Sequence, residues 1–330
     1  MQDIKVINIE PHNYSQEATT ILESFLQVDE RALSREELMA EIDVYDVLIT
    51  RLGHQIDREV IDRGKILKVI VTATTGLDHI DIDYAREHGI TILSLNGEYE
   101  FLRTIPATGE HTFALMLALL RNIPAAANSV LNGKWDRDSF IGRDLEHKKL
   151  GLVGVGRVGR KVAQIAQGFN MQVGGYDPSP NQTINLVEYF SSLNDLLSWA
   201  EIVSVHIPLN SETSLLISEP EFSKMRKGSY LINTSRGKIV DENALMAKLE
   251  QGHLAGAALD VIHSEQKIRD GALSLLIEYA KEQENLIITP HIGGATTDSM
   301  HKTEIFMAQK LLDYFSDKEA KHTGPGNVND

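Results

Sequence analysis

The sequence contains no cysteine among its 330 residues, and it is poor in positive charge. Without cysteine the chain can form no disulfide, no thiolate nucleophile and no cysteine-ligated zinc site. Lysine and arginine number 32 against 47 aspartates and glutamates, which gives a formal net charge of −15. This balance argues against non-specific binding to nucleic acid or to an anionic membrane. It does not exclude an anionic small-molecule substrate, because the electric field at a site is local.

Long apolar runs are missing as well. No stretch reaches the roughly 18 apolar residues that a membrane-spanning helix needs. The opening residues, MQDIKVINIE, alternate as a strand does and lack the basic and apolar regions of a signal peptide. We therefore expect a cytoplasmic protein with no membrane partner and no metal site. Hydrophobic residues still make up 42% of the chain, enough for hydrophobic cores, and a length of 330 residues predicts one large or two ordinary domains.

The most informative stretch is residues 150–177, where strand and helix signals flank a glycine motif. A short apolar run predicts a buried parallel strand, and Gly154, Gly156 and Gly159 follow it as G-x-G-x-x-G. Apolar residues at helical spacing come next, and a second strand ends at Asp177. Glycines at these positions permit a tight turn, the approach of backbone to a pyrophosphate, and close packing of helix on strand.

Asp177 extends this motif toward a dinucleotide. It follows Gly159 by 18 residues, close to the distance at which an acid accepts the hydroxyls of an adenosine ribose. A carboxylate there would repel a 2′-phosphate, so the sequence favours NAD over NADP. Three glycines alone would also suit an ordinary strand-to-helix turn, but the complete pattern predicts an NAD-binding Rossmann unit.

Strand and helix signals alternate on both sides of this unit, which predicts an α/β protein with parallel sheets covered by helices. Strands are expected near residues 4–7, 47–49, 69–71, 90–93, 202–205, 230–232, 255–259 and 286–288. Helices are expected near residues 18–26, 56–61, 83–88, 193–199, 242–249 and 298–315. The polar tail 316–330 is expected to be poorly ordered.

Residues 107–122 form a helix that is apolar nearly all round. Such a helix is buried, either in a core or in a subunit interface. Pro106 precedes it and suggests a hinge between two domains. Earlier in the chain, the loop at residues 72–81 follows a predicted strand, where α/β folds bind ligands. Backbone N–H groups of Thr75 and Gly76 would suit a carboxylate, although an ordinary turn with an aspartate cap explains the same residues equally well.

Three polar side chains after predicted strands suit hydride transfer coupled to proton transfer: Arg236, Glu265 and His291. His291 suits the acid/base role, because an unperturbed imidazole titrates near neutral pH. Glu265 would orient the ring and stabilise its protonated form. Arg236 would hold a substrate carboxylate by charge-assisted hydrogen bonds. Taken singly, each has an ordinary alternative as a cap, a loop cation or a surface acid.

Several motifs together resemble the D-2-hydroxyacid dehydrogenase family. They are NTSRG at 233–237, AALDV at 257–261, TPHIGGAT at 289–296, HIPL at 206–209, the glycine motif and the loop at 74–81. The family includes D-3-phosphoglycerate, D-lactate, glycerate/hydroxypyruvate and formate dehydrogenases. The similarity covers about residues 45–300 in the family's order.

The resemblance implies an NAD-dependent oxidoreductase with two doubly wound parallel-sheet domains. A flavodoxin-like substrate domain would comprise residues 1–106 and 295–330, and a Rossmann NAD-binding domain residues 107–294. Family members are commonly homodimers joined through the nucleotide domain, which would bury residues 107–122. The reaction would interconvert a D-2-hydroxyacid and a 2-oxoacid.

The resemblance also assigns roles to individual residues. Arg236, Glu265 and His291 are the catalytic residues, and Thr75, Gly76 and Arg236 bind the substrate. The cofactor contacts are Gly154, Gly156, Arg157, Val158, Gly159, Asp177, His206, Pro208, Thr234, Ser235, Arg236, Asp260, His291, Gly293 and Gly294.

The chain departs from the family pattern at Gln266, where proline usually follows the glutamate. The segments 96–108 and 267–285 are longer than usual, which leaves the identity of the acid open. Arg51 lies where phosphoglycerate-type relatives contact substrate, but one arginine there is ambiguous. An NAD-sensing scaffold resembling transcriptional corepressors is the alternative. A formate-type enzyme would carry glutamine at the position of Glu265, which argues against that activity.

Overall fold

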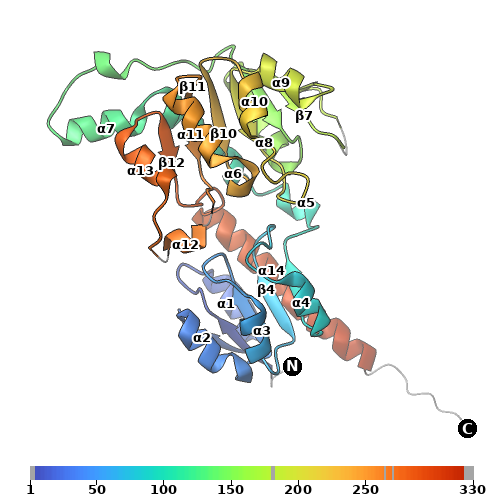
Figure 1. Ribbon diagram of the computed structural model, residues 1–330. Coiled ribbons are helices and arrows are strands. Elements are labelled where there is room, and N and C mark those ends of the chain that lie inside the picture. Colours follow the sequence, from blue (N-terminus) through green and yellow to red (C-terminus); the bar gives the residue numbers. More distant parts are fainter. Residues whose placement is uncertain (1–3, 180–182, 264, 270, 323–330) are drawn as a thin grey trace, which may run out of the picture. The chain divides into compact units, whose positions relative to one another are not determined.

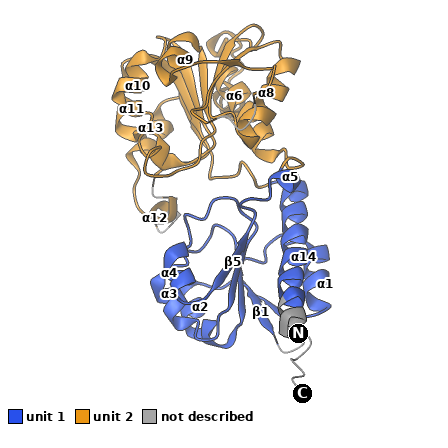
Figure 2. Ribbon diagram, turned by 90° about the vertical axis from the view of Figure 1, so that its right-hand side faces the viewer, with its two compact units in different colours: residues 1–102, 296–330 blue, residues 103–295 orange. Residues whose placement is uncertain are grey.

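The computed structural model describes residues 4–179, 183–263, 265–269 and 271–322. The chain divides into two units, each with its own parallel sheet (Figure 2). Unit 1 comprises residues 1–102 and 296–330, and unit 2 comprises residues 103–295. No single described helix is long and apolar enough to cross a membrane. The helical segments Tyr99–Leu120 and Ile123–Leu131 meet that test only as a pair, bent by 62°.

Unit 1 is built on a parallel sheet, whose strand β4 is labelled in Figure 1. The five strands of this sheet have the order β2-β1-β3-β4-β5. Its strands are β1 (Lys5–Asn8), β2 (Gln27–Glu30), β3 (Val47–Thr50), β4 (Val69–Thr72) and β5 (Thr91–Ser94). β3 and β4 read VLIT and VIVT and are buried at every residue. Such continuous burial is typical of a parallel sheet that helices cover on both faces.

The helices of unit 1 are α1 (Gln16–Glu23), α2 (Arg35–Glu41), α3 (Arg58–Arg63), α4 (Ile82–Glu87), α5 (Tyr99–Leu102) and α14 (Thr297–His322). Apolar side chains of α2, α3 and α4 share one core with the sheet, through residues such as Leu38, Val60 and Ala85. α1 and α14 pack together on the other face (Figure 2). Phe101 of α5 stacks on Phe306 of α14, with ring centroids 4.0 Å apart.

Unit 2 is built on a seven-stranded parallel sheet in the order β12-β11-β10-β9-β6-β7-β8. Its strands are β6 (Lys149–Val153), β7 (Gln172–Tyr176), β8 (Glu188–Tyr189), β9 (Ile202–Val205), β10 (Ser229–Asn233), β11 (Leu254–Leu259) and β12 (Leu286–Ile288). All of its paired strands are parallel, so their carboxyl ends share one edge. Ligands of such sheets bind outside that edge.

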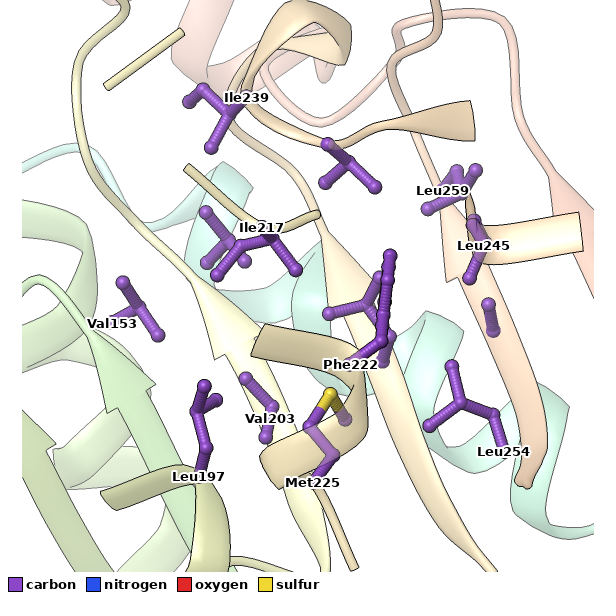
Figure 3. Close-up of a cluster of buried hydrophobic side chains, with 14 of the residues drawn as sticks. Val153, Leu197, Val203, Ile217, Phe222, Met225, Ile239, Leu245, Leu254 and Leu259 are labelled. Atoms are coloured by element: carbon purple, nitrogen blue, oxygen red, sulfur yellow. The ribbon is translucent and has the colours of Figure 1, made fainter. Parts of the chain in front are cut away.

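The helices of unit 2 are α6 (Ala107–Leu120), α7 (Ile123–Leu131), α8 (Arg157–Gly168), α9 (Leu193–Trp199), α10 (Glu219–Lys224), α11 (Glu242–Glu250), α12 (Glu265–Arg269) and α13 (Leu275–Glu282). α6 and α8 contribute to the core on one face of the sheet. On the other face, Leu197, Phe222, Leu245 and Leu276 of α9, α10, α11 and α13 pack against the strands. Figure 3 shows this cluster closing around Phe222, which is fully buried.

The predicted fold class is confirmed: two α/β units carry parallel sheets, one in flavodoxin-like and one in Rossmann order. The expectation for the C-terminal tail is wrong at its start. α14 continues to His322, well past the predicted end near Phe315. Residues 323–330, also in that tail, lie outside the described residues. α6 owes its burial to α8, β10 and β11 within unit 2, so no partner subunit is needed to cover it.

Candidate active site

The glycine turn after β6 is packed so tightly that two of its glycines cannot be replaced. Gly154 has a φ of +94°, and a Cβ added there would lie 2.6 Å from the carbonyl oxygen of His206. A Cβ on Gly159 would lie 2.2 Å from the carbonyl oxygen of Gly154. Both glycines are therefore required by the protein's own packing, which brings the start of α8 against β6.

Gly156 differs from its two neighbours. A Cβ added there would meet no atom within 4 Å, and its φ of −75° suits any residue. Packing among the described residues therefore gives no reason for glycine at this position. An approaching ligand would give one, because glycine lets a pyrophosphate come close to the backbone at the start of α8. Arg157 is the first residue of α8, and burial lowers the pKa of its guanidinium.

Asp177 follows β7 and anchors the same turn. Its Oδ2 accepts a hydrogen bond from the Val155 N–H at 3.0 Å, and its Oδ1 accepts one from the Ser179 N–H at 3.1 Å. A carboxylate has about four lone-pair positions, so each oxygen retains room for a ribose hydroxyl. The structure thus adds to the predicted ribose contact a second role in holding Val155.

His206 follows β9 beside this turn. Its Nε2 lies 2.9 Å from the Ser204 hydroxyl, and its Nδ1 is buried without a hydrogen-bond partner among the described residues. Burial lowers the pKa of His206 to about 3, so the ring is neutral at pH 7. Pro208, two residues on, accepts a hydrogen bond at its carbonyl from the Thr213 hydroxyl. The strand end therefore presents a neutral, uncommitted ring nitrogen.

Asn233 shapes the turn that carries Arg236 at the end of β10. Its Oδ1 accepts from the Ser235 N–H at 3.0 Å, and its Nδ2 donates to the Arg236 carbonyl at 3.0 Å. Thr234 is buried, with its hydroxyl 3.0 Å from that of Thr112 on α6. The Arg236 Nη1 donates to the Ser235 carbonyl at 2.7 Å. The guanidinium is thus held close to its own backbone.

Gly237 joins this turn to the segment that carries Glu265. A Cβ on Gly237 would lie 2.1 Å from the carbonyl carbon of Ile262, so the two backbones touch here. Glu265 begins α12 three residues later, and its Oε1 accepts a hydrogen bond from the Ile262 N–H at 3.3 Å. Any side chain larger than hydrogen at 237 would push the two segments apart.

His291 and Glu265 form a direct pair at the ends of β12 and β11. The His291 Nδ1 lies 2.8 Å from the Glu265 Oε2, and the two side chains are 19% and 30% exposed. A carboxylate on Nδ1 directs Nε2 outward and stabilises the ring when it is protonated. His291 also has a φ of +56°, a left-handed conformation that costs a non-glycine residue energy and that occurs often at functional sites.

Asp260 holds the strained loop in place. Its carboxylate is 1% exposed and accepts hydrogen bonds from the Thr289 hydroxyl, the Ile292 N–H and the Gly293 N–H at 2.6, 2.9 and 2.7 Å. The Asp260 carbonyl accepts from the His291 N–H at 2.8 Å. The family resemblance implies a cofactor contact for Asp260; in the structure Asp260 also orders the loop around His291.

His111 on α6 completes this network and is absent from the sequence-based site. Its Nε2 lies 3.1 Å from the Asp260 Oδ1 and 3.2 Å from the Thr289 hydroxyl. It precedes Asp260 by 149 residues, so no local pattern links the two.

Thr75 and Gly76 belong to unit 1, in the loop after β4. The Thr74 hydroxyl donates to the Gly76 carbonyl at 2.8 Å, and the Thr74 carbonyl accepts from the Leu95 N–H at 3.0 Å. No hydrogen bond joins the N–H groups of Thr75 and Gly76 to another described residue. The alternative explanation also has support, since Asp81 caps α4 by accepting from the Tyr84 N–H.

The structure therefore brings Glu265 and His291 into contact and places Arg236 in the backbone segment that touches Ile262. The cofactor candidates surround the same carboxyl edge of the unit 2 sheet, at the ends of β6, β7, β9, β10, β11 and β12. Across the described ranges, no group of three or more histidines and acids could hold a metal ion.

Known proteins that are similar to this chain belong to the family that its motifs resemble. A family model for the NAD-binding domain of D-isomer-specific 2-hydroxyacid dehydrogenases matches residues 113–293. A hydroxypyruvate reductase of Thermotoga maritima is 35% identical over 301 residues, covering 90% of this chain and 94% of the relative. A D-3-phosphoglycerate dehydrogenase of Archaeoglobus fulgidus is 36% identical over 94% of this chain, which spans 57% of that relative's length.

Solved structures with the same architecture include the TT0316 protein of Thermus thermophilus. It has a TM-score of 0.82 and 33% identity, with 95% of this chain and 97% of that chain covered. A D-lactate dehydrogenase of Aquifex aeolicus, solved with NAD and lactic acid, has a TM-score of 0.80 and 27% identity. That alignment covers 99% of both chains.

Replacing Asp260 by asparagine should destabilise unit 2 by about 2–4 kcal/mol at pH 7, because an amide presents N–H to donors that need an acceptor. Burial would raise the pKa of Asp260, but hydrogen bonds from His111, Thr289 and two backbone N–H groups lower it below its ordinary 3.8. The carboxylate therefore contributes its full stabilisation of unit 2 above about pH 3.8. This stabilisation is lost as the pH falls below that value and through the lowered pKa of the folded protein.

Urea unfolding of wild type and Asp260→Asn measures this difference. The difference in free energy of unfolding between the two proteins should be equal at pH 7 and pH 5.5 and should become smaller only near pH 3.5. Asp138→Asn, on an aspartate side chain that is 77% exposed, is the control and should change stability by less than about 0.5 kcal/mol. A gap that is unchanged at pH 3.5 would contradict the pKa direction.

Proposed function

The chain belongs to the D-isomer-specific 2-hydroxyacid dehydrogenase family and is an NAD-dependent enzyme, and from this premise we propose how its residues divide the reaction. His291 is the acid/base, Glu265 holds it in position, and Arg236 binds the substrate carboxylate. The contact between His291 Nδ1 and Glu265 Oε2, 2.8 Å long, is the observation that carries the proposal. It favours turnover over the scaffold alternative, which needs no such pair.

In the oxidative direction His291 takes the hydroxyl proton of the substrate at Nε2. Glu265, bound at Nδ1, stabilises the positive charge that this transfer creates on the ring. NAD⁺ held at the carboxyl edge of the unit 2 sheet would supply the acceptor for the hydride from the same carbon. In the reductive direction His291 would return the proton to the carbonyl oxygen, and NADH would supply the hydride. Each direction moves one hydride and one proton, so charge and atoms balance.

The remaining roles follow from the strand ends. Arg236 is the arginine of the turn after β10, and a planar guanidinium can bind a carboxylate through two parallel hydrogen bonds. We propose that backbone N–H groups of Thr75 and Gly76 in unit 1 also bind the substrate carboxylate, which would make unit 1 the substrate domain. Asp260 and its hydrogen bonds keep the His291 backbone in its left-handed conformation and so position the imidazole. Proton transfer needs this kind of preorganisation.

The cofactor would bind at the carboxyl edge of the unit 2 sheet. Gly154, Gly156 and Gly159, with Arg157 and Val158 at the start of α8, suit the pyrophosphate. Asp177 suits the adenosine ribose. The other contacts we propose are His206, Pro208, Thr234, Ser235, Asp260, Gly293 and Gly294. The uncommitted His206 Nδ1 and the open space at Gly156 support this placement.

We also propose a homodimer joined through unit 2 and a cytoplasmic location. The support for the homodimer lies at the end of α7 and in the segment after it, where three large apolar side chains are exposed. Leu131, Trp135 and Ile141 are 86%, 90% and 77% exposed. Apolar groups gathered in one exposed segment are typical of an interface between subunits.

Replacing His291 by asparagine should lower kcat by about 10²–10⁴-fold, the share that a positioned acid/base contributes. Asparagine tolerates the left-handed backbone, so the fold and NADH binding should persist. The assay follows NADH oxidation with hydroxypyruvate, glyoxylate and pyruvate. His147 has a similar φ of +62°, and its side chain is 76% exposed, so His147→Asn is a matched control and should keep full rate. A fully active His291→Asn enzyme would overturn the assignment.

Replacing Asp177 by asparagine should raise the ratio of kcat/KM for NADPH over NADH by about tenfold, because repulsion of a 2′-phosphate is removed. Asparagine keeps an acceptor for the Val155 N–H, so the turn is preserved. Steady-state kinetics with both cofactors measure the ratio. A ratio that stays at the wild-type value would show that the acid does not face the ribose.

The double variant Leu131→Ser/Trp135→Ser should be monomeric by sedimentation velocity at micromolar concentration, because burial of both side chains holds the interface. Leu273 is 89% exposed outside this segment, so Leu273→Ser is the control and should remain dimeric. A wild-type protein that sediments as a monomer would refute the homodimer.

A further inference from the structure

The carboxyl edge of the unit 1 sheet has a topological switch point between β1 and β3. The order β2-β1-β3-β4-β5 places these strands side by side, and the chain leaves them toward opposite sides of the sheet. Ligands of doubly wound sheets bind at such a point. If unit 1 receives the substrate, as the proposed function requires, the side chains here determine which substituents the acid can carry.

Glu10 follows β1 and fills the backbone donors at this point. Its Oε2 accepts hydrogen bonds from the Thr50 hydroxyl at 2.9 Å and from the Arg51 N–H, and its Oε1 accepts from the Gly53 N–H at 2.9 Å. A Cβ on Gly53 would lie 2.6 Å from that oxygen, so the carboxylate sits directly in the loop. N–H groups that an anionic ligand would use are already bound to the chain's own carboxylate.

Arg51 follows β3, and its guanidinium is also matched by a carboxylate. Its Nη2 lies 2.6 Å from the Glu304 Oε1, and Glu304, on α14, is 1% exposed. Its Nη1 donates to the His12 carbonyl at 3.0 Å, and its Nε is buried without a partner among the described residues. The second Glu304 oxygen accepts from the Ser15 N–H at 2.7 Å, at the start of α1. Glu304 is thus fixed from both sides.

The cation at the end of β5 follows the same pattern. Lys310 of α14 donates to the Ser94 carbonyl and to the Glu98 carboxylate. The switch point itself holds one guanidinium against two carboxylates. Burial raises the pKa of Glu304, while Arg51, the Ser15 N–H and nearby His301 act to lower it. Arg51 and Lys310 are therefore both paired with carboxylates of the chain, so neither is available to bind a second anionic group on a ligand.

We infer that the acid turned over by this chain carries no charge beyond its reacting carboxylate, and that Glu304 enforces this by neutralising Arg51. The inference rests on the proposed function and narrows its substrate class. A phosphorylated acid brings a dianion to its tail, and it would meet an arginine already committed to Glu304 and a loop already occupied by Glu10. Hydroxypyruvate, glyoxylate and pyruvate bring no such charge.

The test compares hydroxypyruvate with 3-phosphohydroxypyruvate, which differ only in the phosphate, as substrates for NADH oxidation. Wild type should prefer hydroxypyruvate in kcat/KM by about tenfold or more. Glu304→Gln keeps an acceptor for Ser15 and frees the Arg51 charge, so it should shift the ratio toward the phosphorylated acid by about tenfold, the scale of one charge-assisted hydrogen bond.

Asp46→Asn is the matched control. Asp46 precedes β3 at the opposite edge of the same sheet, is buried, and pairs with Lys68 at 2.7 Å. Asp46→Asn removes the same charge but at the opposite edge of the sheet. The ratio of kcat/KM for the two acids should therefore stay within about twofold of the wild-type ratio. A double variant, Arg51→Gln/Glu304→Gln, should return the ratio to the wild-type value, because the freed cation is gone.

A wild-type preference for 3-phosphohydroxypyruvate would overturn the inference, whether or not Glu304→Gln folds. An equal shift in Glu304→Gln and Asp46→Asn, or none in Glu304→Gln, would also overturn it. Lack of turnover with every 2-oxoacid would instead refute the proposed function. These outcomes are distinguishable in one set of assays, with thermal unfolding of each variant as the check on folding.

Discussion

The carboxylate of Asp260 is the constraint on which the unit 2 site depends. It is buried, and it accepts hydrogen bonds from His111 of α6, from the Thr289 hydroxyl and from the backbone N–H groups of Ile292 and Gly293. These bonds hold His291 in a left-handed conformation that the loop alone would not keep. Once the backbone is fixed, one hydrogen bond to Glu265 is enough to set the direction of the imidazole. Asp260 thus positions His291 through the backbone of the loop that carries it.

Both units use carboxylates to organise the ends of parallel strands. In unit 2 the buried carboxylate of Asp260 orders the loop that carries His291. In unit 1 the partly buried Glu10 accepts hydrogen bonds from the loop after β3, and the buried Glu304 pairs with Arg51. In our proposals, the first arrangement positions an acid/base and the second limits the charge of the substrate. In a protein with a net charge of −15, an anion is bound where the local arrangement of donors and cations opposes the overall charge.

Much of this could be predicted from the sequence because its signals are local. The glycine motif at 154–159 and Asp177 lie within one strand–helix–strand unit, and the predicted fold class is confirmed. Short elements such as β2, which reads QVDE, escaped because an edge strand with two charges has no apolar run. The end of α14 was predicted too early because Ser316 and the charged residues after it resemble a loop.

The tertiary contacts could not be predicted, because nothing in the chain marks residues that meet across long separations. Arg51 and Glu304 are 253 residues apart, and His111 and Asp260 are 149 apart. Resemblance supplied Arg236, Glu265 and His291, whose catalytic roles stay a proposal. It could not reveal that the turn after Arg236 touches the segment before Glu265, at Gly237 and Ile262.

That contact has a practical implication for anyone who would move this site to another scaffold. Gly237 carries no functional group, yet its missing side chain lets the turn of the arginine rest against Ile262, next to the acid. Copying the arginine, glutamate and histidine onto a new framework without this glycine would separate two of them by at least the width of a methyl group. Gly237 must therefore be transferred together with the three side chains.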